Sequence, residues 1–183
     1  CSICERGKTP NRAQSGCTGC PDGEVAAAGD AECTECSRGT YANTAQSKCE
    51  ACPAGTWGNI TGAASNATCI ACPHGRFSSA TGINSEDKCN VCPAGTVSSS
   101  TGATECATEC LAGERSSDDS TGCIGCGAGT TSGPKSASCT MCPAGRYAKE
   151  DSTECLSCEL GRYCTEGKQQ TCGLGTVAAD IGA

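Results

Sequence analysis

The stretch CPAGTWGNITGAASNATCIAC, residues 52–72, decides the fold of this chain because it contains one complete unit of a repeat. It runs from the second cysteine of one C-x-x-C pair to the end of the next pair, with little apolar material between them. Nine C-x-x-C pairs, and a tenth stretched by one residue at Cys106 and Cys110, recur at intervals of 16 to 20 residues. A period kept over the whole length predicts stacked units rather than one globule.

We therefore predict a single continuous array over residues 1–183, built from about eleven rungs. The rungs start near residues 1, 17, 33, 49, 69, 89, 106, 123, 139, 155 and 172, and residues 156–183 form a divergent end repeat.

The composition shows what holds such units together. The chain has 22 Cys among 183 residues, about 12%, but only five aromatic residues and one Met. The few large apolar side chains bury too little area to offset the entropy cost of folding. Covalent cross-links must therefore stabilise the fold. This predicts a small disulfide-rich protein, an elongated linear array of short β-hairpin and turn repeats with little or no helix. Such a cysteine content also indicates an oxidising compartment, either extracellular or at the cell surface.

Several classes of function are disfavoured by the same composition. The net charge of −7 and the lack of a basic run argue against nucleic acid as a partner. No stretch approaches the roughly 18 apolar residues of a membrane span. Catalysis needs a nucleophile, a base and a cleft, and the only histidine, His74, lies in a repeat turn. We predict that the protein is not an enzyme and has no catalytic, cofactor-binding or metal-binding residues.

Paired C-x-x-C motifs also form zinc ribbons, so zinc is an alternative role for these cysteines. Ten such pairs in an acidic chain, with His74 outside any ligand pattern, fit disulfides better. The acidic run SSDDSTG, with Asp118 and Asp119, lacks the alternating ligands of a calcium loop and is interpreted as a solvated tip.

Glycine and the aromatic residues keep a fixed place within each repeat. A glycine lies three residues after the second cysteine of every pair, which predicts a turn position with positive φ. All five rings lie five residues after that cysteine, and we interpret each as a lid over a neighbouring disulfide. The rings are Tyr41, Trp57, Phe77, Tyr147 and Tyr163.

Two disulfide connectivities fit the spacing. The second cysteine of one pair can bond the first of the next, or successive pairs can bond crosswise, as Cys1 to Cys17 and Cys4 to Cys20. We favour the first, because each segment of variable length is then enclosed in its own loop, although spacing alone leaves both open. The favoured scheme uses Cys4, Cys17, Cys20, Cys33, Cys36, Cys49, Cys52, Cys69, Cys72, Cys89, Cys92, Cys106, Cys110, Cys123, Cys126, Cys139, Cys142, Cys155, Cys158 and Cys164.

That scheme leaves Cys1 and Cys172 without partners. Either the sequence is a window of a longer repeat chain, or Cys172 bonds Cys1 of a neighbouring copy in a head-to-tail homo-polymer.

Two further sites are candidates for covalent modification. Asn59 (NIT) and Asn66 (NAT) are acceptor sequons for N-linked glycans, both within the loop between Cys52 and Cys69.

The sequences CPAGTWG, CPAGTVSSSTGATEC and CPAGRYAKEDSTEC resemble the cysteine-rich repeats of ephrin receptors and of the tumour necrosis factor receptor family. They are also similar to runs in cysteine-rich surface proteins of ciliates and other protists. The resemblance covers nearly the whole chain, implies an extracellular location and implies the disulfide pairing favoured above.

We predict a non-enzymatic extracellular structural protein: a glycosylated, disulfide-laddered rod of a surface coat, stalk or filament. The alternative is a receptor-type ectodomain that binds a protein ligand. In the first case each rung is expected to contact only its neighbours.

Overall fold

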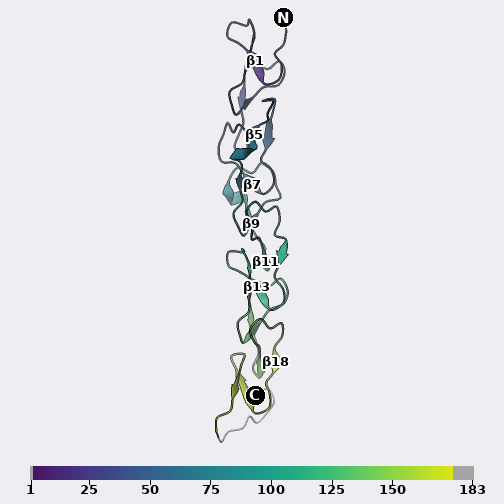
Figure 1. Cartoon of the computed structure of the whole chain (residues 1–183), viewed down its shortest axis with the longest axis vertical. Helices are drawn as coiled ribbons and strands as arrows, with labels where there is room; N and C mark the ends of the chain where they lie inside the picture. Colours follow the sequence, from purple (N-terminus) through teal and green to yellow (C-terminus); the bar gives the residue numbers. More distant parts are fainter. Residues whose placement is uncertain (1, 175–183) are drawn as a thin grey trace. The chain divides into compact units, whose positions relative to one another are not determined.

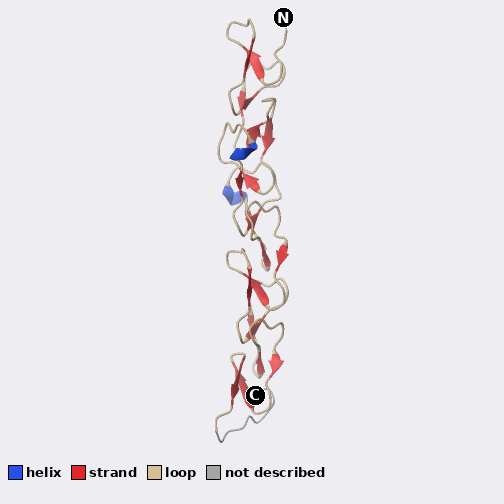
Figure 2. Cartoon of the chain, in the orientation of Figure 1, coloured by secondary structure: helices blue, strands red, loops and turns tan. Residues whose placement is uncertain are grey.

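The computed structural model describes residues 2–174 (Figure 1). These residues cluster into two compact units. Of the described residues, unit 1 comprises 2–91 and 100–105, and unit 2 comprises 92–99 and 106–174. Each unit is a series of two-stranded antiparallel hairpins joined by turns (Figure 2). This confirms the predicted class of a small disulfide-rich repeat protein.

Unit 1 contains five hairpins in chain order. They are β1 (Lys8–Pro10) with β2 (Cys17–Gly19), β3 (Glu24–Val25) with β4 (Thr34–Glu35), β5 (Thr40–Ala42) with β6 (Cys49–Ala51), β7 (Thr56–Trp57) with β8 (Ile70–Ala71), and β9 (Arg76–Phe77) with β10 (Asn90–Val91). The two longest loops each add one turn of 3-10 helix, η1 (Asn66–Thr68) and η2 (Glu86–Lys88).

Unit 2 repeats this arrangement. Its hairpins are β11 (Thr96–Val97) with β12 (Thr108–Glu109), β13 (Glu114–Ser116) with β14 (Cys123–Gly125), β15 (Thr130–Thr131) with β16 (Thr140–Met141), β17 (Arg146–Tyr147) with β18 (Leu156–Ser157), and β19 (Arg162–Thr165) with β20 (Lys168–Thr171).

Disulfides close the loops of the hairpins from β1–β2 to β17–β18. Within the described residues, nine of the ten bonds join the second cysteine of one pair to the first cysteine of the next, which is the connectivity favoured from the sequence, and Cys158–Cys164 closes a small loop of its own. The bonds are Cys4–Cys17, Cys20–Cys33, Cys36–Cys49, Cys52–Cys69, Cys72–Cys89, Cys92–Cys106, Cys110–Cys123, Cys126–Cys139, Cys142–Cys155 and Cys158–Cys164.

The glycine three residues after the second cysteine, here called the register glycine, sets the start of each hairpin. All ten register glycines within residues 2–174 have positive φ, which confirms the turn predicted from the sequence. Their carbonyls face the second cysteine of the next pair: the Cys36 N–H donates to Gly23 O at 3.0 Å, and the Cys52 N–H to Gly39 O at 2.8 Å.

Backbone hydrogen bonds join each loop to the next within a unit. In unit 1 the Gly55 N–H donates to Ser78 O at 2.8 Å, and the Ser78 N–H donates to Ala103 O at 3.1 Å. A bond in the opposite direction runs from the Gly102 N–H to Cys72 O at 2.8 Å. Three consecutive disulfide loops are thereby joined without a long strand.

A second set of contacts skips one loop. A Cβ on Gly55 would overlap the carbonyl of Gly102, which lies in the loop two places further along. A Cβ on Gly23 would overlap the backbone of Gly62 in the same way, and in unit 2 a Cβ on Gly95 would overlap the backbone of Lys135. The prediction that each rung contacts only its neighbours is therefore wrong, because each loop also rests against the second-next one.

The core of each unit consists mainly of disulfides. Cys36 and Cys72 are completely buried, and Val25 and Ala42 pack with Cys36 in one cluster. Tyr147 packs against Cys158 and Cys164, as the lid interpretation predicts.

The lid interpretation is wrong for Tyr163, which is exposed and donates its hydroxyl to Gln170 Oε1 at 2.7 Å. Val25 has the place of a ring in its repeat and covers the next disulfide, Cys36–Cys49. The position five residues after the second cysteine therefore requires an apolar side chain, which can be aromatic or aliphatic.

Candidate functional site

The loop tips are the chemically distinctive part of the repeat. Residues in the left-handed region mark the tips, and several of these are not glycine: Gln14, Gln46, Ser120, Lys135, Asp151 and Glu166. Non-glycine residues are uncommon there, so the surrounding structure must hold them. We call these the tip residues.

Two of the tip residues, Gln46 and Lys135, bind the base of the preceding loop. The Gln46 side-chain amide donates from Nε2 to Cys20 O at 3.1 Å and to Pro21 O at 2.9 Å. In unit 2 Lys135 makes an ion pair with Glu109, at 2.6 Å between Nζ and Oε1. These contacts hold the stack in register. They could not be found from cysteine spacing, although the repeated N-x-A-Q-S sequence at residues 11–15 and 43–47 was a visible signal.

The two sequons lie where a glycan could be attached. Asn59 and Asn66 are both exposed, Asn59 in the connection after β7 and Asn66 at the start of η1. Asn66 also lines an open pocket of unit 1, together with Asp22, Tyr41, Gln46 and Glu50.

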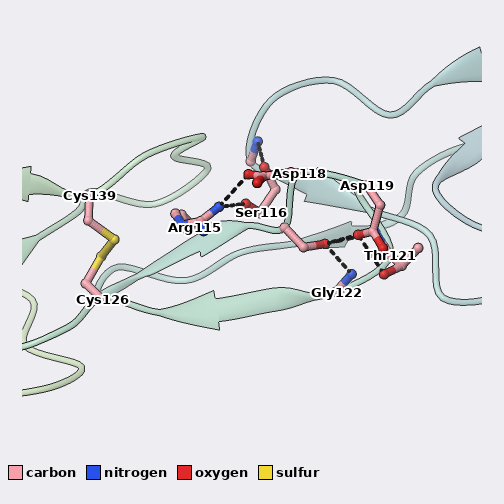
Figure 3. A network of polar contacts seen from close by, with 10 residues as sticks. Arg115, Ser116, Asp118, Asp119, Thr121, Gly122, Cys126 and Cys139 are labelled. Atoms are coloured by element: carbon pink, nitrogen blue, oxygen red, sulfur yellow. Dashed lines mark hydrogen bonds and ion pairs between the residues drawn. A yellow bond between two sulfur atoms is a disulfide. The ribbon is translucent and has the colours of Figure 1, made fainter.

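The acidic run at residues 116–122 forms a closed hydrogen-bond network (Figure 3). Ser117 Oγ donates to Asp119 Oδ1 at 2.6 Å, and the Thr121 hydroxyl donates to the same oxygen at 2.8 Å. These bonds, with one from the Thr121 N–H, lower the pKa of Asp119 below its ordinary value. Asp118 instead pairs with Arg115 at 3.0 Å. Both carboxylates therefore stabilise their own tip.

No metal-binding arrangement is found in the described part of the chain, where no group of three or more His, Cys, Asp or Glu residues converges. His74 is exposed in its turn.

Cys172 is half-buried and is the one cysteine without a disulfide among residues 2–174. Cys1 and residues 175–183 lie outside the described residues, so the predicted bond between Cys1 and Cys172 and most of the last rung lie there too.

The hairpins and the serial disulfides define the class of protein: small disulfide-rich repeats of the kind found in extracellular proteins. Residues 23–69 match the family model described as tyrosine-protein kinase ephrin type A/B receptor-like. The matched segment spans the loops closed by Cys36–Cys49 and Cys52–Cys69, so the resemblance to ephrin-receptor-like repeats is confirmed. A search among curated proteins gives no significant match.

This family and the density of disulfides together indicate an extracellular location. Among the described residues, none of the helical segments is long and apolar enough to cross a membrane.

Proposed function

We propose that this chain is a structural protein of an extracellular coat, stalk or filament. The observation that carries the proposal is the interlocking of each disulfide loop with both the next and the second-next loop, as at Gly55, Ser78 and Gly102. A force applied along such a unit must break backbone hydrogen bonds in several loops together, and disulfides limit how far each loop extends.

Assembly through the chain ends is part of the proposal. Cys172 has no disulfide partner within residues 2–174, and in the proposed assembly it bonds Cys1 of another copy. Two thiols would form it by losing two protons and two electrons to the thiol-oxidising machinery of the secretory compartment. A contact between different surfaces of identical subunits that does not close into a ring produces a filament.

Electron microscopy of material from its native source tests this function. We expect long fibres in the absence of reducing agent, and we expect them to shorten or separate after reduction, because the proposed intersubunit disulfide would be broken. Short single particles under both conditions would contradict a filament, and would favour a receptor ectodomain or a segment of a longer chain.

We also propose N-linked glycans at Asn59 and Asn66, supported by the exposure of both side chains. We expect the intact mass of the secreted protein to fall by one glycan in Asn59→Gln and by one in Asn66→Gln. Asn84→Gln is the matched control, because Asn84 is exposed but is followed by Ser85 and Glu86, which do not complete a sequon. An unchanged mass in either sequon variant would exclude a glycan at that site.

A receptor-type ectodomain is the second candidate, and a protein ligand would be expected to contact the apolar residues that are exposed between paired cysteines. Ile70, Val91, Ile124 and Met141 are each more than two-fifths exposed. Ile70 and Ile124 are the first residue between the cysteines, whereas Val91 and Met141 are the second. Successive strand residues point to opposite faces, so Ile70 and Val91 of unit 1 differ in register, as do Ile124 and Met141 of unit 2. This favours the structural role.

A further inference from the structure

One of the two sequons lies at a pocket of unit 1, and the other does not. Asn66 is among the residues that line this open pocket, whose volume is about 810 Å³, whereas Asn59 of the same disulfide loop is not among them. Both asparagine side chains are exposed. A sugar attached to Asn66 therefore begins at the wall of the pocket, and a sugar attached to Asn59 begins outside it.

Three successive disulfide loops form the walls of this pocket. Asp22 comes from the turn after Cys20, Tyr41 and Glu50 come from the β5–β6 hairpin, and Asn66 comes from the start of η1. The volume lies within the usual range for small-ligand sites. A molecule in the pocket can thus contact three loops of the repeat at once.

The side chains that line the pocket suit a saccharide. The Tyr41 ring is half-buried, and its hydroxyl donates to Glu50 Oε2 at 3.4 Å. An aromatic ring packs against the C–H face of a pyranose, while carboxylate oxygens accept hydrogen bonds from sugar hydroxyls and from an acetamido N–H. Asp22 provides a second, exposed carboxylate. Lys48 Nζ lies 3.2 Å from Glu50 Oε1 and offsets its charge, so a neutral sugar fits this site better than a cation.

A sugar attached to Asn66 is better placed to fill the pocket than a free one. The Asn66 side chain is exposed at the start of η1, so its amide is accessible for attachment. A short covalent tether gives the attached sugar an effective concentration of about millimolar at the pocket. A free saccharide outside the cell would have to reach that concentration to compete.

We propose that the first N-acetylglucosamine of the glycan on Asn66 lies in this pocket, against the Tyr41 ring. The proposal rests on the glycan at Asn66 under Proposed function and goes beyond it, because it gives the sugar a contact with the protein. The seated sugar ties the loop that contains Asn66 to the loop that contains Tyr41. It stabilises the stack of loops, which the glycan on Asn59 does not do.

A hydrogen bond beside the pocket reports on this effect. The Ala42 N–H donates to Ala63 O at 2.8 Å and joins the same two loops. Ala42 itself lines the pocket, next to Tyr41 in β5. A sugar seated across the two loops should therefore slow the opening of this bond.

Amide hydrogen exchange of the full secreted chain measures the opening at the Ala42 N–H. We expect Asn66→Gln, which removes the glycan, to raise the exchange rate roughly tenfold, as the loss of about one net hydrogen bond would. Asn59→Gln removes the other glycan and is the matched control, which should leave the rate unchanged. Glu86 has the place of Asn66 in the next repeat, at the start of η2, so the turn itself does not require asparagine.

The same comparison in a Tyr41→Leu background makes the test specific to the seat. Val25 shows that this repeat position accepts an aliphatic side chain. Leucine has no ring, so loss of the glycan should no longer change the exchange rate at Ala42. Tyr41→Phe keeps the ring and loses only the bond to Glu50, so the effect of the glycan should persist. Nuclear Overhauser contacts between the Tyr41 ring and the sugar on Asn66 are expected in the parent chain.

Three results would overturn the seat. They are an intact mass that shows no glycan on Asn66, an exchange rate at Ala42 that does not respond to loss of the glycan, and a response of equal size with and without the Tyr41 ring. A glycan found by mass together with either of the last two results would retain the modification and reject the seat. Reducible fibres from native material would retain the filament in every case.

An external saccharide is tested separately with N,N′-diacetylchitobiose added to the Asn66→Gln chain. We expect no saturable shift of the Tyr41 resonances at concentrations up to about 1 mM, because the free sugar lacks the tether. Saturation below that concentration, without protection of Ala42 in the glycosylated chain, would assign the pocket to a free ligand and overturn the proposal.

Discussion

The Gly55→Ala variant is expected to lose about 3 kcal/mol or more of unfolding free energy in unit 1. Gly55 has φ of 79°, and an added Cβ would overlap the carbonyl of Gly102 in the second-next loop. Backbone cannot move aside as a flexible side chain does, so the contacts between the two loops would have to open. Denaturant unfolding with the disulfides intact measures the loss.

Gly29→Ala separates backbone strain from overlap. Gly29 has φ of 89°, but no described atom lies within 4 Å of its Cβ position. We expect this control to lose only the cost of a left-handed alanine, about 1 to 2 kcal/mol. Equal losses in the two variants would show that contact with the second-next loop contributes nothing.

Removing the Cys36–Cys49 disulfide, through Cys36→Ala with Cys49→Ala, is expected to cost about 3 kcal/mol for a loop of this size. Cys36 is completely buried, so some packing with Val25 and Ala42 is lost as well. Hydrogen exchange should show the effect reaching the following loop. The Gly62 N–H donates to Cys36 O at 2.8 Å and should lose protection.

The matched control removes the Cys158–Cys164 disulfide, which belongs to unit 2. We expect the Gly62 amide to keep its protection in that variant, and unit 2 amides such as Cys126 N–H to keep theirs when Cys36–Cys49 is removed. Loss of protection throughout the chain in either variant would mean that the disulfide loops unfold as one cooperative unit.

The local features of the repeat could be read from the sequence because they depend on a few neighbouring residues. The glycine after CPA in residues 52–55 had to adopt positive φ, and it does. Because the prediction that each aromatic ring covers a disulfide used only neighbouring residues, it was not correct for every ring. Tyr147 covers a disulfide, but Tyr163 lies inside the short loop closed by Cys158–Cys164, and its ring remains exposed.

Contacts between loops could not be read in this way. The sequence predicted that rungs touch only their neighbours, yet Gly55 meets Gly102, and Lys135 pairs with Glu109. Such contacts depend on how far each loop rotates and rises relative to the preceding one. That rotation arises from many small backbone dihedrals and from the hydrogen bonds that fix them, and no single residue encodes it.

The amino-acid sequence by itself determined the repeat, the need for disulfides, the turn at each register glycine and the extracellular class, because cysteine density and spacing act locally. Only the tertiary structure decided what each glycine faces. Nine register glycines are buried, whereas Gly161 is exposed, although all ten occupy the same sequence position. What covers a buried register glycine, such as the Gly102 carbonyl at Gly55, depends on the stacking of loops in space.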